Sequence, residues 1–547
     1  MRKLLAFVFA ALITGSLFAG GIVTNTNQST AWVRLPSRNA SVGIDAAYYN
    51  PAGLMKLENG FHFSLSNQTI FQTRNVKNFY AGPGGSYGLN QYVYEGEVTA
   101  PFFPSIYGVY KTDRLAFSLG FNPVGGGGGA EYSIGLPSFE MTPSDLVPAL
   151  GPSYGVQQYR IDAYLKGESI FFGLQGGISF KINDWISIAA GMRYVSAKNT
   201  YTGHLKDIEV NTGSIENPNW QRADQIMSSI SASYQTAATG STALVTAGAG
   251  SLTFAQAQAL GYITPTQRAQ FEGGLTALGY PTTTPIAAAD QIYKGATVKY
   301  ANNATLLGDQ YGDIEQTGYG ITPIFSVNIS PSENLNIGIK YEMITRMEIT
   351  NKTAGDFMVG IASDGTPVTM FPDGATTPSD MPASLTLGLD YKLGDAAKIS
   401  VGTNYFWDKT ANYGHKVDKD NNSSTPSEFI PNKDIINNNG FSIHGGVEAY
   451  LSEKLLVSGG YIWANQGVND IYQTDLNYFL GSNTFGAGGA YKIMNNLELN
   501  LGFSYTAYTN NDKLVDHVYS PTGIIFKVPE FYGKNAMIFS VGVDFSF

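Results

Sequence analysis

The chain contains no cysteine, few charged residues and no apolar run long enough to cross a membrane as a helix. Without cysteine, disulfide bonds and thiolate metal sites are excluded. Charged residues make up 14% of the 547 residues, against about 25% in typical soluble domains. The net charge of −10 argues against a nucleic-acid partner.

The N-terminus has the pattern of an export signal. Arg2 and Lys3 form a basic region, Leu4 to Ile13 form an apolar core of ten residues, and small residues favour cleavage after Ala19. A membrane helix needs roughly 20 apolar residues, so this core is too short to span. Residues 225–267 lack charge, but Ser, Thr and Gln interrupt them. We expect an exported chain, with residues 1–19 removed, that has no membrane helix.

Glycine and aromatic residues are abundant, with 63 Gly, 34 Tyr and 31 Phe. Residues 497–508 alternate between apolar residues such as Leu501 and Phe503 and polar residues such as Asn500 and Ser504. A strand with this period has one apolar face and one polar face. In an outer-membrane barrel the apolar face meets lipid and the polar face lines the lumen. The aromatic content and the scarcity of charge favour such a barrel over a soluble sandwich.

The alternation recurs in fourteen segments, and single-chain bacterial barrels have an even number of strands. Most of these segments reach the roughly 9–11 residues that cross a bilayer. Short turns, such as Thr112-Asp113 and Asn495-Asn496, alternate with long loops, and both termini fall on the short-turn side. The predicted strands are 60–72, 101–112, 114–124, 165–182, 185–203, 319–330, 335–350, 382–393, 397–411, 439–451, 455–467, 483–493, 497–509 and 534–547. The predicted fold is all-β: a transmembrane antiparallel barrel of fourteen strands.

Two segments lack plain strand character. Residues 20–58 show little alternation and precede the first strand, so we predict a hatch inside the lumen, followed by the barrel over residues 59–547. Residues 204–318 form the largest predicted external loop. Its segments 221–240 and 252–278 are rich in helix-forming residues, which predicts short helices.

The hatch segment contains the tetrapeptide Asn50-Pro51-Ala52-Gly53. Pro51 fixes φ, and we expect Gly53 to permit a positive φ, which together favour a tight turn. This tetrapeptide, its place after the cleavage site, the strand count and the terminal Phe547 together resemble the FadL/TodX family of outer-membrane transport proteins. That resemblance implies transport of long-chain fatty acids or aromatic hydrocarbons, with Asn50, Pro51, Ala52 and Gly53 in the hatch. It also implies that Phe547 is read by the barrel assembly machinery.

A second feature ends the third predicted strand: Pro123, Val124 and five glycines, Gly125, Gly126, Gly127, Gly128 and Gly129. Proline does not donate to a ladder and glycine weakens one, so the strand should bend or bulge away from its neighbour. In the family that this chain resembles, a kink in the third strand opens a window through which substrate leaves sideways. The alternative here is a flexible external loop.

The resemblance also implies an external capture groove. Candidates are Phe254, Tyr262, Phe271 and Leu275, which could instead pack the helices of the large loop together. Another apolar stretch runs from Leu136 to Val147, beside the glycine run.

Motifs for catalysis and metal binding are incomplete. Gly151 to Gly155 match Gly-x-Ser-x-Gly around Ser153, but Pro148 and Pro152 predict a loop where a nucleophile elbow needs a strand and a helix. The segment that begins at Asp418 lacks the glycine and the last carboxylate of a calcium loop. The histidines are not closely spaced, and His444 falls on the polar face of its strand. We expect no cofactor, no metal and no enzymatic activity.

Three functions remain open at this stage. The first is passive transport of a hydrophobic small molecule across the outer membrane of a Gram-negative-type bacterium, by a monomer surrounded by lipid. It would use external capture, an apolar pocket gated by the hatch, and lateral exit at the third strand. The second is a general aqueous porin, against which the long segment before the first strand argues. The third is an outer-membrane lipase that uses Ser153.

Overall fold

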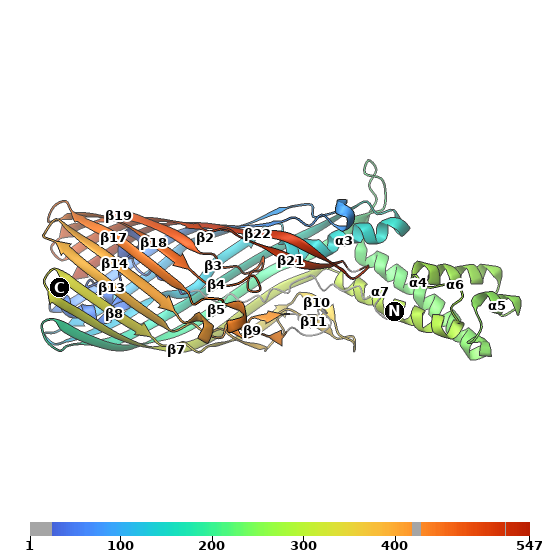
Figure 1. Ribbon diagram of the computed structural model, residues 1–547, viewed down its shortest axis with the longest axis horizontal. Coiled ribbons are helices and arrows are strands. Elements are labelled where there is room, and N and C mark those ends of the chain that lie inside the picture. Colours follow the sequence, from blue (N-terminus) through green and yellow to red (C-terminus); the bar gives the residue numbers. More distant parts are fainter. Residues whose placement is uncertain (1–23, 418–427, 520) are drawn as a thin grey trace.

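The computed structural model describes residues 24–417, 428–519 and 521–547. The predicted signal peptide (1–19) and the loop that begins at Asp418 lie outside these residues. Most strands belong to one antiparallel sheet, which closes on itself because the first strand pairs with the last, from His62–Ser546 to Asn78–Glu530. Figure 1 shows the inclined strands of this barrel, with the C-terminus at one end and helices projecting from the other.

Fourteen strands close the barrel, as predicted. They are β1 (Gly60–Asn78), β2 (Val93–Lys111), β3 (Leu115–Tyr132), β4 (Gln158–Lys181), β5 (Ile186–Asn211), β7 (Gln310–Ser332), β8 (Leu335–Glu342), β13 (Ser384–Leu393), β14 (Ala397–Phe406), β17 (Phe441–Tyr450), β18 (Leu455–Asn465), β19 (Ser482–Met494), β20 (Leu497–Tyr508) and β22 (Ile524–Ser546).

The other strands extend the wall or lie in the long loops. Four belong to the barrel sheet: β6 (Trp220–Arg222), β9 (Glu348–Gly355), β12 (Thr376–Pro378) and β21 (Asn511–Tyr519). Two small hairpins lie apart from it: β10 (Met358–Ile361) with β11 (Pro367–Thr369), and β15 (Lys416–Val417) with β16 (Glu428–Phe429).

Helices lie in the lumen and at the long-loop end. The N-terminal segment, residues 24–59, contains α1 (Thr30–Arg34), α2 (Ala46–Tyr49) and the 3₁₀ helix η1 (Pro51–Lys56). The long loops contain η2 (Pro83–Gly85), α3 (Pro137–Tyr154), α4 (Ala223–Leu244), the π-helical turn η3 (Val245–Ala249), α5 (Phe254–Ala259), α6 (Pro265–Ala277), α7 (Ile286–Leu306), η4 (Asp408–Thr410) and α8 (Asn432–Ile435). None of the helices in the described ranges has the length and apolarity needed to span a bilayer.

The wall turns its apolar side outward. On β20, Leu501 is 53% exposed and Phe503 is also exposed, whereas Asn500 and Ser504, on either side of them in sequence, are buried against the interior. A soluble sandwich would bury the apolar face instead. This arrangement is the one that a barrel surrounded by lipid requires.

The structure corrects several predicted boundaries. The predicted loop 204–318 is too long, because β5 continues to Asn211 and β7 begins at Gln310. Alternation is interrupted there by a bulge in β5 at Asp207, whose φ is +48°, where the register with β4 shifts. The predicted helices correspond to α4, α5 and α6, but α7 was not predicted. The last strand begins at Ile524 rather than at residue 534, and it forms a hairpin with β21.

Candidate functional site: the N-terminal segment and the gap beside β3

Inward-facing glycines let the N-terminal segment lie directly against the barrel wall. A Cβ atom on Gly338 would lie 2.4 Å from the carbonyl oxygen of Asn39, and one on Gly486 would lie 2.5 Å from that of Val33. Any larger residue at either position would push the segment away from the wall. Much of the unusual glycine content of the strands is thereby explained by close packing inside the lumen.

Asn50 fixes the predicted turn to the wall. Its side chain is fully buried, and its Nδ2 donates to the carbonyl oxygen of Ser41 (3.1 Å) and to Oδ1 of Asn328 on β7 (2.7 Å). Its Oδ1 accepts from Oγ of Ser326 at 3.0 Å. Every hydrogen bond of this amide is therefore made to protein groups, two of them on the barrel.

The next two residues are held through their carbonyl oxygens. Ser179 on β4 donates to the carbonyl of Pro51, and Ser187 on β5 donates to that of Ala52, both at 2.7 Å. The tetrapeptide thus spans three neighbouring strands.

Gly53 has a different role from the one predicted. It is not among the glycines with positive φ. A Cβ atom there would lie 2.4 Å from the carbonyl oxygen of Ser41 and 2.6 Å from Nδ2 of Asn50. Close approach of backbone, rather than backbone conformation, is what requires glycine at this position.

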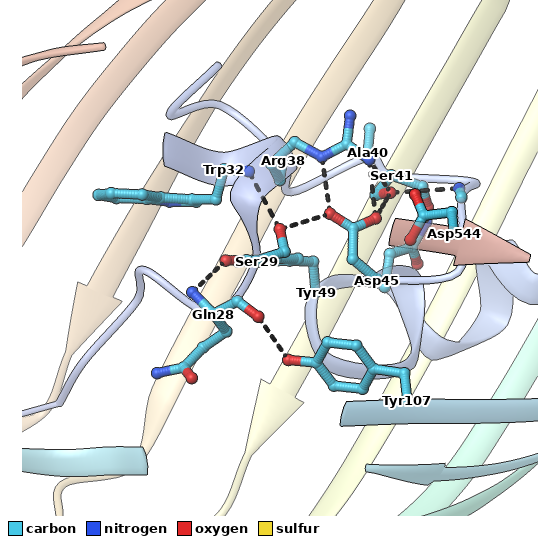
Figure 2. A network of polar contacts seen from close by, with 12 residues as sticks. Gln28, Ser29, Trp32, Arg38, Ala40, Ser41, Asp45, Tyr49, Tyr107 and Asp544 are labelled. Atoms are coloured by element: carbon cyan, nitrogen blue, oxygen red, sulfur yellow. Dashed lines mark hydrogen bonds and ion pairs between the residues drawn. The ribbon is translucent and has the colours of Figure 1, made fainter. Parts of the chain in front are cut away.

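The buried carboxylate of Asp45 connects different parts of the N-terminal segment by hydrogen bonds (Figure 2). Both oxygens of Asp45 accept from the Arg38 guanidinium, at 2.7 and 2.9 Å, and Ser41 and Ser29 donate to the same carboxylate. Ser29 also caps α1 by accepting from the amide of Trp32 at 3.0 Å. Burial opposes the charge of Asp45, but Arg38 and the two hydroxyls hold the pKa of the carboxyl below its usual range.

Further buried ion pairs involve the wall. Arg34 reaches Glu448 on β17 at 2.9 Å. Glu342 on β8 accepts from Arg193 on β5 at 2.8 Å and from Lys340 at 2.7 Å. Lys340 also donates to the carbonyl oxygen of Tyr48 in α2 at 2.8 Å. Displacing the segment would leave Arg34 and Glu448 as uncompensated buried charges and would break the bond of Lys340 to Tyr48, so these two contacts oppose displacement.

Gln28 connects the segment to the third strand. Its Nε2 donates to the carbonyl of Pro123 at 2.7 Å, and its Oε1 accepts from Nδ2 of Asn122 at 2.7 Å. Its backbone is fixed as well, because the Gln28 amide donates to Tyr49 and its carbonyl accepts from Tyr107 on β2 (Figure 2). The sequence offers no signal for this role, since Gln28 lies in a stretch without periodicity.

β3 separates from β2 at the glycine run. The two strands pair as far as Ile106–Phe121, and the next pair is Glu97–Glu131. On its other side β3 stays paired with β4, with register shifts that flank Gly125. Gly126 has φ +98°, and a Cβ atom there would lie 2.4 Å from a backbone oxygen of β4. The glycine run is therefore a bulged strand and not a flexible loop.

The start of the N-terminal segment lies in this separation. Thr24 forms an antiparallel bridge with Gly125, and the amide of Asn25 donates to the carbonyl of Val124 at 2.9 Å. Residues 24 and 25 thus occupy part of the edge that β2 leaves unpaired.

A cavity of about 440 Å³ lies at the same place, and we call it the gap cavity. Its walls come from the N-terminal segment, from β1 to β4, from the region after β18 and from the last strands. Phe102 on β2 belongs to the lining and is 78% exposed, so the cavity reaches the outer face of the barrel. Its lining includes Thr24, Asn25, Thr26, Asn27, Trp32, Ile70, Gln72, Val98, Phe103, Gly125, Gly126, Gly129, Glu168, Ile170, Tyr478, Leu480, Tyr508, Lys534 and Ile538.

A second cavity, of about 260 Å³, lies toward the short-turn end and is lined by charged groups that include Arg34, Asp45 and Asp544. The N-terminal segment contributes to both linings and so lies between them.

The predicted lateral-gate residues therefore gather at one place. Gly125, Gly126 and Gly129 line the gap cavity, Pro123 accepts from Gln28, and Gly127 and Gly128 belong to the bulged part of β3. Their role in exit stays a prediction.

The four predicted groove residues lie in the helical loop. Phe254 and Leu275 are buried, and Phe254 stacks on Phe271 with ring centroids 4.5 Å apart. Tyr262 is 46% exposed. Of the four, Tyr262 has the side chain most accessible to a ligand, and the capture groove stays a prediction.

Ser153 lies in a helix rather than in the predicted loop. α3 runs from Pro137 to Tyr154 and includes Pro143, Pro148 and Pro152. Its apolar residues, among them Phe139 and Leu146, are buried in the mouth of the barrel, and this packing outweighs the prolines. The residues before Ser153 are helical, so the strand that a nucleophile elbow needs is not there. No group of three metal-ligating side chains was found within the described ranges.

A scan against protein-family models and a search of curated proteins found no match. Solved structures do match. A Pseudomonas aeruginosa FadL homologue has a TM-score of 0.55 at 12% identity, over 97% of this chain and 100% of that one. The toluene transporters TbuX of Ralstonia pickettii (14% identity) and TodX of P. putida (15%) each have a TM-score of 0.45, over 92% of this chain and 94% of theirs.

The strand count, the filled lumen, the bulged third strand and the match along the whole FadL homologue agree with one another. The chain therefore has the fold of the FadL/TodX family.

Proposed function

We propose that this protein carries hydrophobic small molecules across the outer membrane of a Gram-negative-type bacterium by a passive, lateral route. The observation that carries the proposal is the gap cavity, which begins beside the N-terminal segment in the lumen and reaches the exposed Phe102 on the outer face. A molecule that left by this route would enter lipid without crossing an aqueous channel.

The chemistry of the cavity fits an apolar substrate. Ile70, Val98, Phe103, Ile170 and Leu480 contribute apolar surface, and a cavity of about 440 Å³ is within the usual size range of small-molecule sites. The resemblance to the FadL/TodX family supports the same substrate class, fatty acids or aromatic hydrocarbons.

The N-terminal segment is proposed as the hatch, with Asn50, Pro51, Ala52 and Gly53 as its anchor. At rest, its ion pairs and hydrogen bonds hold it in the lumen, and its first residues occupy the edge of the gap. A general porin would need an open lumen, and the segment's contacts with strands on several sides of the barrel oppose one. Substrate would arrive from the long-loop end, past α3, with Phe254, Tyr262, Phe271 and Leu275 as candidates for capture.

The proposal includes a monomer, because closure of the barrel leaves no free sheet edge except at the gap beside β3, part of which Thr24 and Asn25 occupy. It also includes recognition of Phe547 by the barrel assembly machinery. Phe547 pairs with Phe61 through two backbone hydrogen bonds of 2.7 and 2.9 Å at the closure of the barrel.

Uptake into liposomes tests the proposal. Vesicles that contain the purified protein should take up oleate or toluene faster than empty vesicles, while small sugars and ions should pass at the rate of empty vesicles. Equal uptake of the hydrophobic probes by both kinds of vesicle, or appreciable single-channel conductance, would contradict it.

A further inference from the structure

The helix α3 lies in the mouth of the barrel at the long-loop end (Figure 1). Every residue from Pro137 to Val147 is buried. The partners of α3 come from several sides of the mouth. The Ser138 amide donates to Asp475 in the loop after β18 at 2.9 Å, and the ring centroid of Phe139 lies 5.6 Å from that of Phe357, which follows β9. The helix therefore fills the mouth rather than lining one wall.

The gap cavity lies next to the residues on which α3 packs. Phe139 and Leu146 of the helix belong to one apolar cluster with Tyr478 and Leu480. Tyr478 and Leu480 also line the gap cavity. These two residues thus connect the helix to the cavity, and α3 separates the cavity from the medium on the long-loop side.

Two buried carboxylates fix α3 in the mouth. The first, Glu140, accepts from the hydroxyl groups of Tyr94 on β2 and Tyr159 on β4, the second at 2.6 Å. It also accepts from the backbone amide of Asn90 at 2.7 Å. Hydrogen bonds to an ionised acceptor are roughly twice as strong as neutral ones. Glu140 therefore fixes the helix to the strands on both sides of β3.

The second carboxylate, Asp145, fixes α3 to the strands where the barrel closes. It accepts from the hydroxyl group of Tyr80, which follows β1, at 2.5 Å and from Nε2 of His517 on β21 at 2.8 Å. Within the parts of the chain that the structure describes, neither Asp145 nor Glu140 pairs with a lysine or an arginine. Hydroxyl groups, one imidazole and one backbone amide stabilise the two charges instead.

The N-terminal segment is held in a different way. Its cations Arg34 and Arg38 pair with the buried carboxylates of Glu448 and Asp45. Separating such a pair leaves a buried charge without its partner. When α3 leaves the mouth, by contrast, its carboxylates enter water, and the tyrosine hydroxyls left behind are neutral groups that water can satisfy. The contacts of α3 are therefore strong but reversible, as a lid requires.

The sequence of α3 makes the helix depend on its place in the mouth. Pro143, Pro148 and Pro152 lie inside it. Each lacks the amide proton of a helical hydrogen bond and crowds the preceding turn, so the helix is unstable wherever packing does not compensate. Two glycines with left-handed backbone lie at its ends, Gly135 with φ +71° and Gly155 with φ +66°. Outside the mouth, the segment would be an unfolded chain between two glycine hinges.

We propose that α3 is the entry lid of the barrel, which opens by leaving the mouth and losing its helical structure, and that Glu140 and Asp145 are the latch residues that hold it closed. The inference rests on the proposed transport function and adds an entrance to it. Opening of α3 connects the medium with the gap cavity while the N-terminal segment stays in place, because separate contacts hold the two.

Cysteine labelling measures the opening of α3. Thr142 is 6% exposed, and its hydroxyl has no hydrogen-bond partner among the described residues, so T142C adds a buried thiol without breaking a hydrogen bond. In T142C/E140Q/D145N the rate of labelling by maleimide should rise about 100-fold, because charge-assisted hydrogen bonds become neutral ones. The matched control T142C/E131Q/D162N removes two charges from exposed positions of β3 and β4 and should label as T142C does.

A proline substitution distinguishes unfolding of the lid from motion of a rigid helix. Pro148→Ala stabilises a helical α3 but not an unfolded one, so T142C/P148A should label at least about tenfold more slowly than T142C. A rigid helix would open equally often with either residue. An unchanged rate in T142C/P148A would therefore overturn the loss of helical structure. An unchanged rate in T142C/E140Q/D145N, or an equal rise in its control, would overturn the latch.

Uptake into liposomes tests whether the lid is the entrance. E140Q/D145N should take up oleate and toluene at least about threefold faster than wild type, and E131Q/D162N should match wild type. Faster labelling without faster uptake would overturn the role in entry, while uptake by wild type would still support transport. If wild type takes up neither probe, the transport proposal fails, and the labelling rates alone decide on the movable lid. If the double variant does not fold, E140Q and D145N should each raise the labelling rate about tenfold.

Discussion

Replacing Asn50 with alanine should release the N-terminal segment without unfolding the barrel. The side chain makes three buried hydrogen bonds, to Ser41, Asn328 and Ser326. Each is worth about 1 kcal/mol net. The N50A variant should therefore lose about 3 kcal/mol of local stability, which corresponds to an open population about 100-fold larger.

The absence of cysteine makes this population measurable. Ser37 lies in the same segment and is buried, so a single S37C substitution places one thiol that reacts with maleimide only when the segment opens. The labelling rate of S37C/N50A should exceed that of S37C by about 100-fold if closing is faster than labelling. The matched control is S37C/N59A, because Asn59 makes two side-chain hydrogen bonds at an exposed position, to Asp113 and Lys111.

The change in electrophoretic mobility on heating reports unfolding of the barrel. It should be the same for S37C, S37C/N50A and S37C/N59A, since the barrel itself is intact. A rise in labelling of less than about threefold for N50A, or an equal rise for N59A, would refute the claim that Asn50 anchors the segment.

Three other predictions follow from single contacts. Gly53→Ala should raise the same labelling rate at least about tenfold, because its Cβ would lie 2.4 Å from a backbone oxygen; an unchanged rate would show that the segment adapts. Glu342→Gln leaves two buried cations, Arg193 and Lys340, without their carboxylate and should lower the free energy of unfolding by about 3 kcal/mol. The unfolding temperature should fall accordingly. The control Glu315→Gln, in an exposed pair, should lower the free energy of unfolding by less than about 1 kcal/mol. Burial raises the pKa of Asp408 from 3.8 to about 6, so the stability from this carboxyl is complete below pH 3.8 and is lost as the pH rises through 6. The Gly440 amide donates to Asp408, so its hydrogen exchange, corrected for the intrinsic rate, should be slower at pH 4 than at pH 8. Asp408→Asn should remove this difference.

The barrel could be predicted because its signal is local. Alternation along segments such as 497–508 reports the two faces of a strand directly, and each of the fourteen segments overlaps a strand of the wall. Prediction failed where the alternation of apolar and polar residues is interrupted, as at Asp207. It also failed where packing outweighs low helix propensity, as in α3 with its three internal prolines.

The site was predicted only in part. The glycine run and Asn50 stand out in the sequence because proline and glycine constrain the backbone directly. Gln28 does not, because its environment arises only when the N-terminal segment enters the lumen beside β3. Gly53 was identified for the wrong reason, since sequence shows that a glycine is present but not whether space or φ requires it.

Closing the gap reversibly tests the lateral route most directly. Thr24 and Gly125 form an antiparallel bridge, and Cα atoms of such pairs lie about 4.5–5.5 Å apart, within the range of a disulfide. In T24C/G125C, oxidation should abolish uptake of oleate into liposomes, and reduction should restore it to the rate of wild type, while T24C and G125C alone should not respond to redox state. Uptake that continues at the wild-type rate in the fully oxidised protein would contradict exit through the gap beside β3.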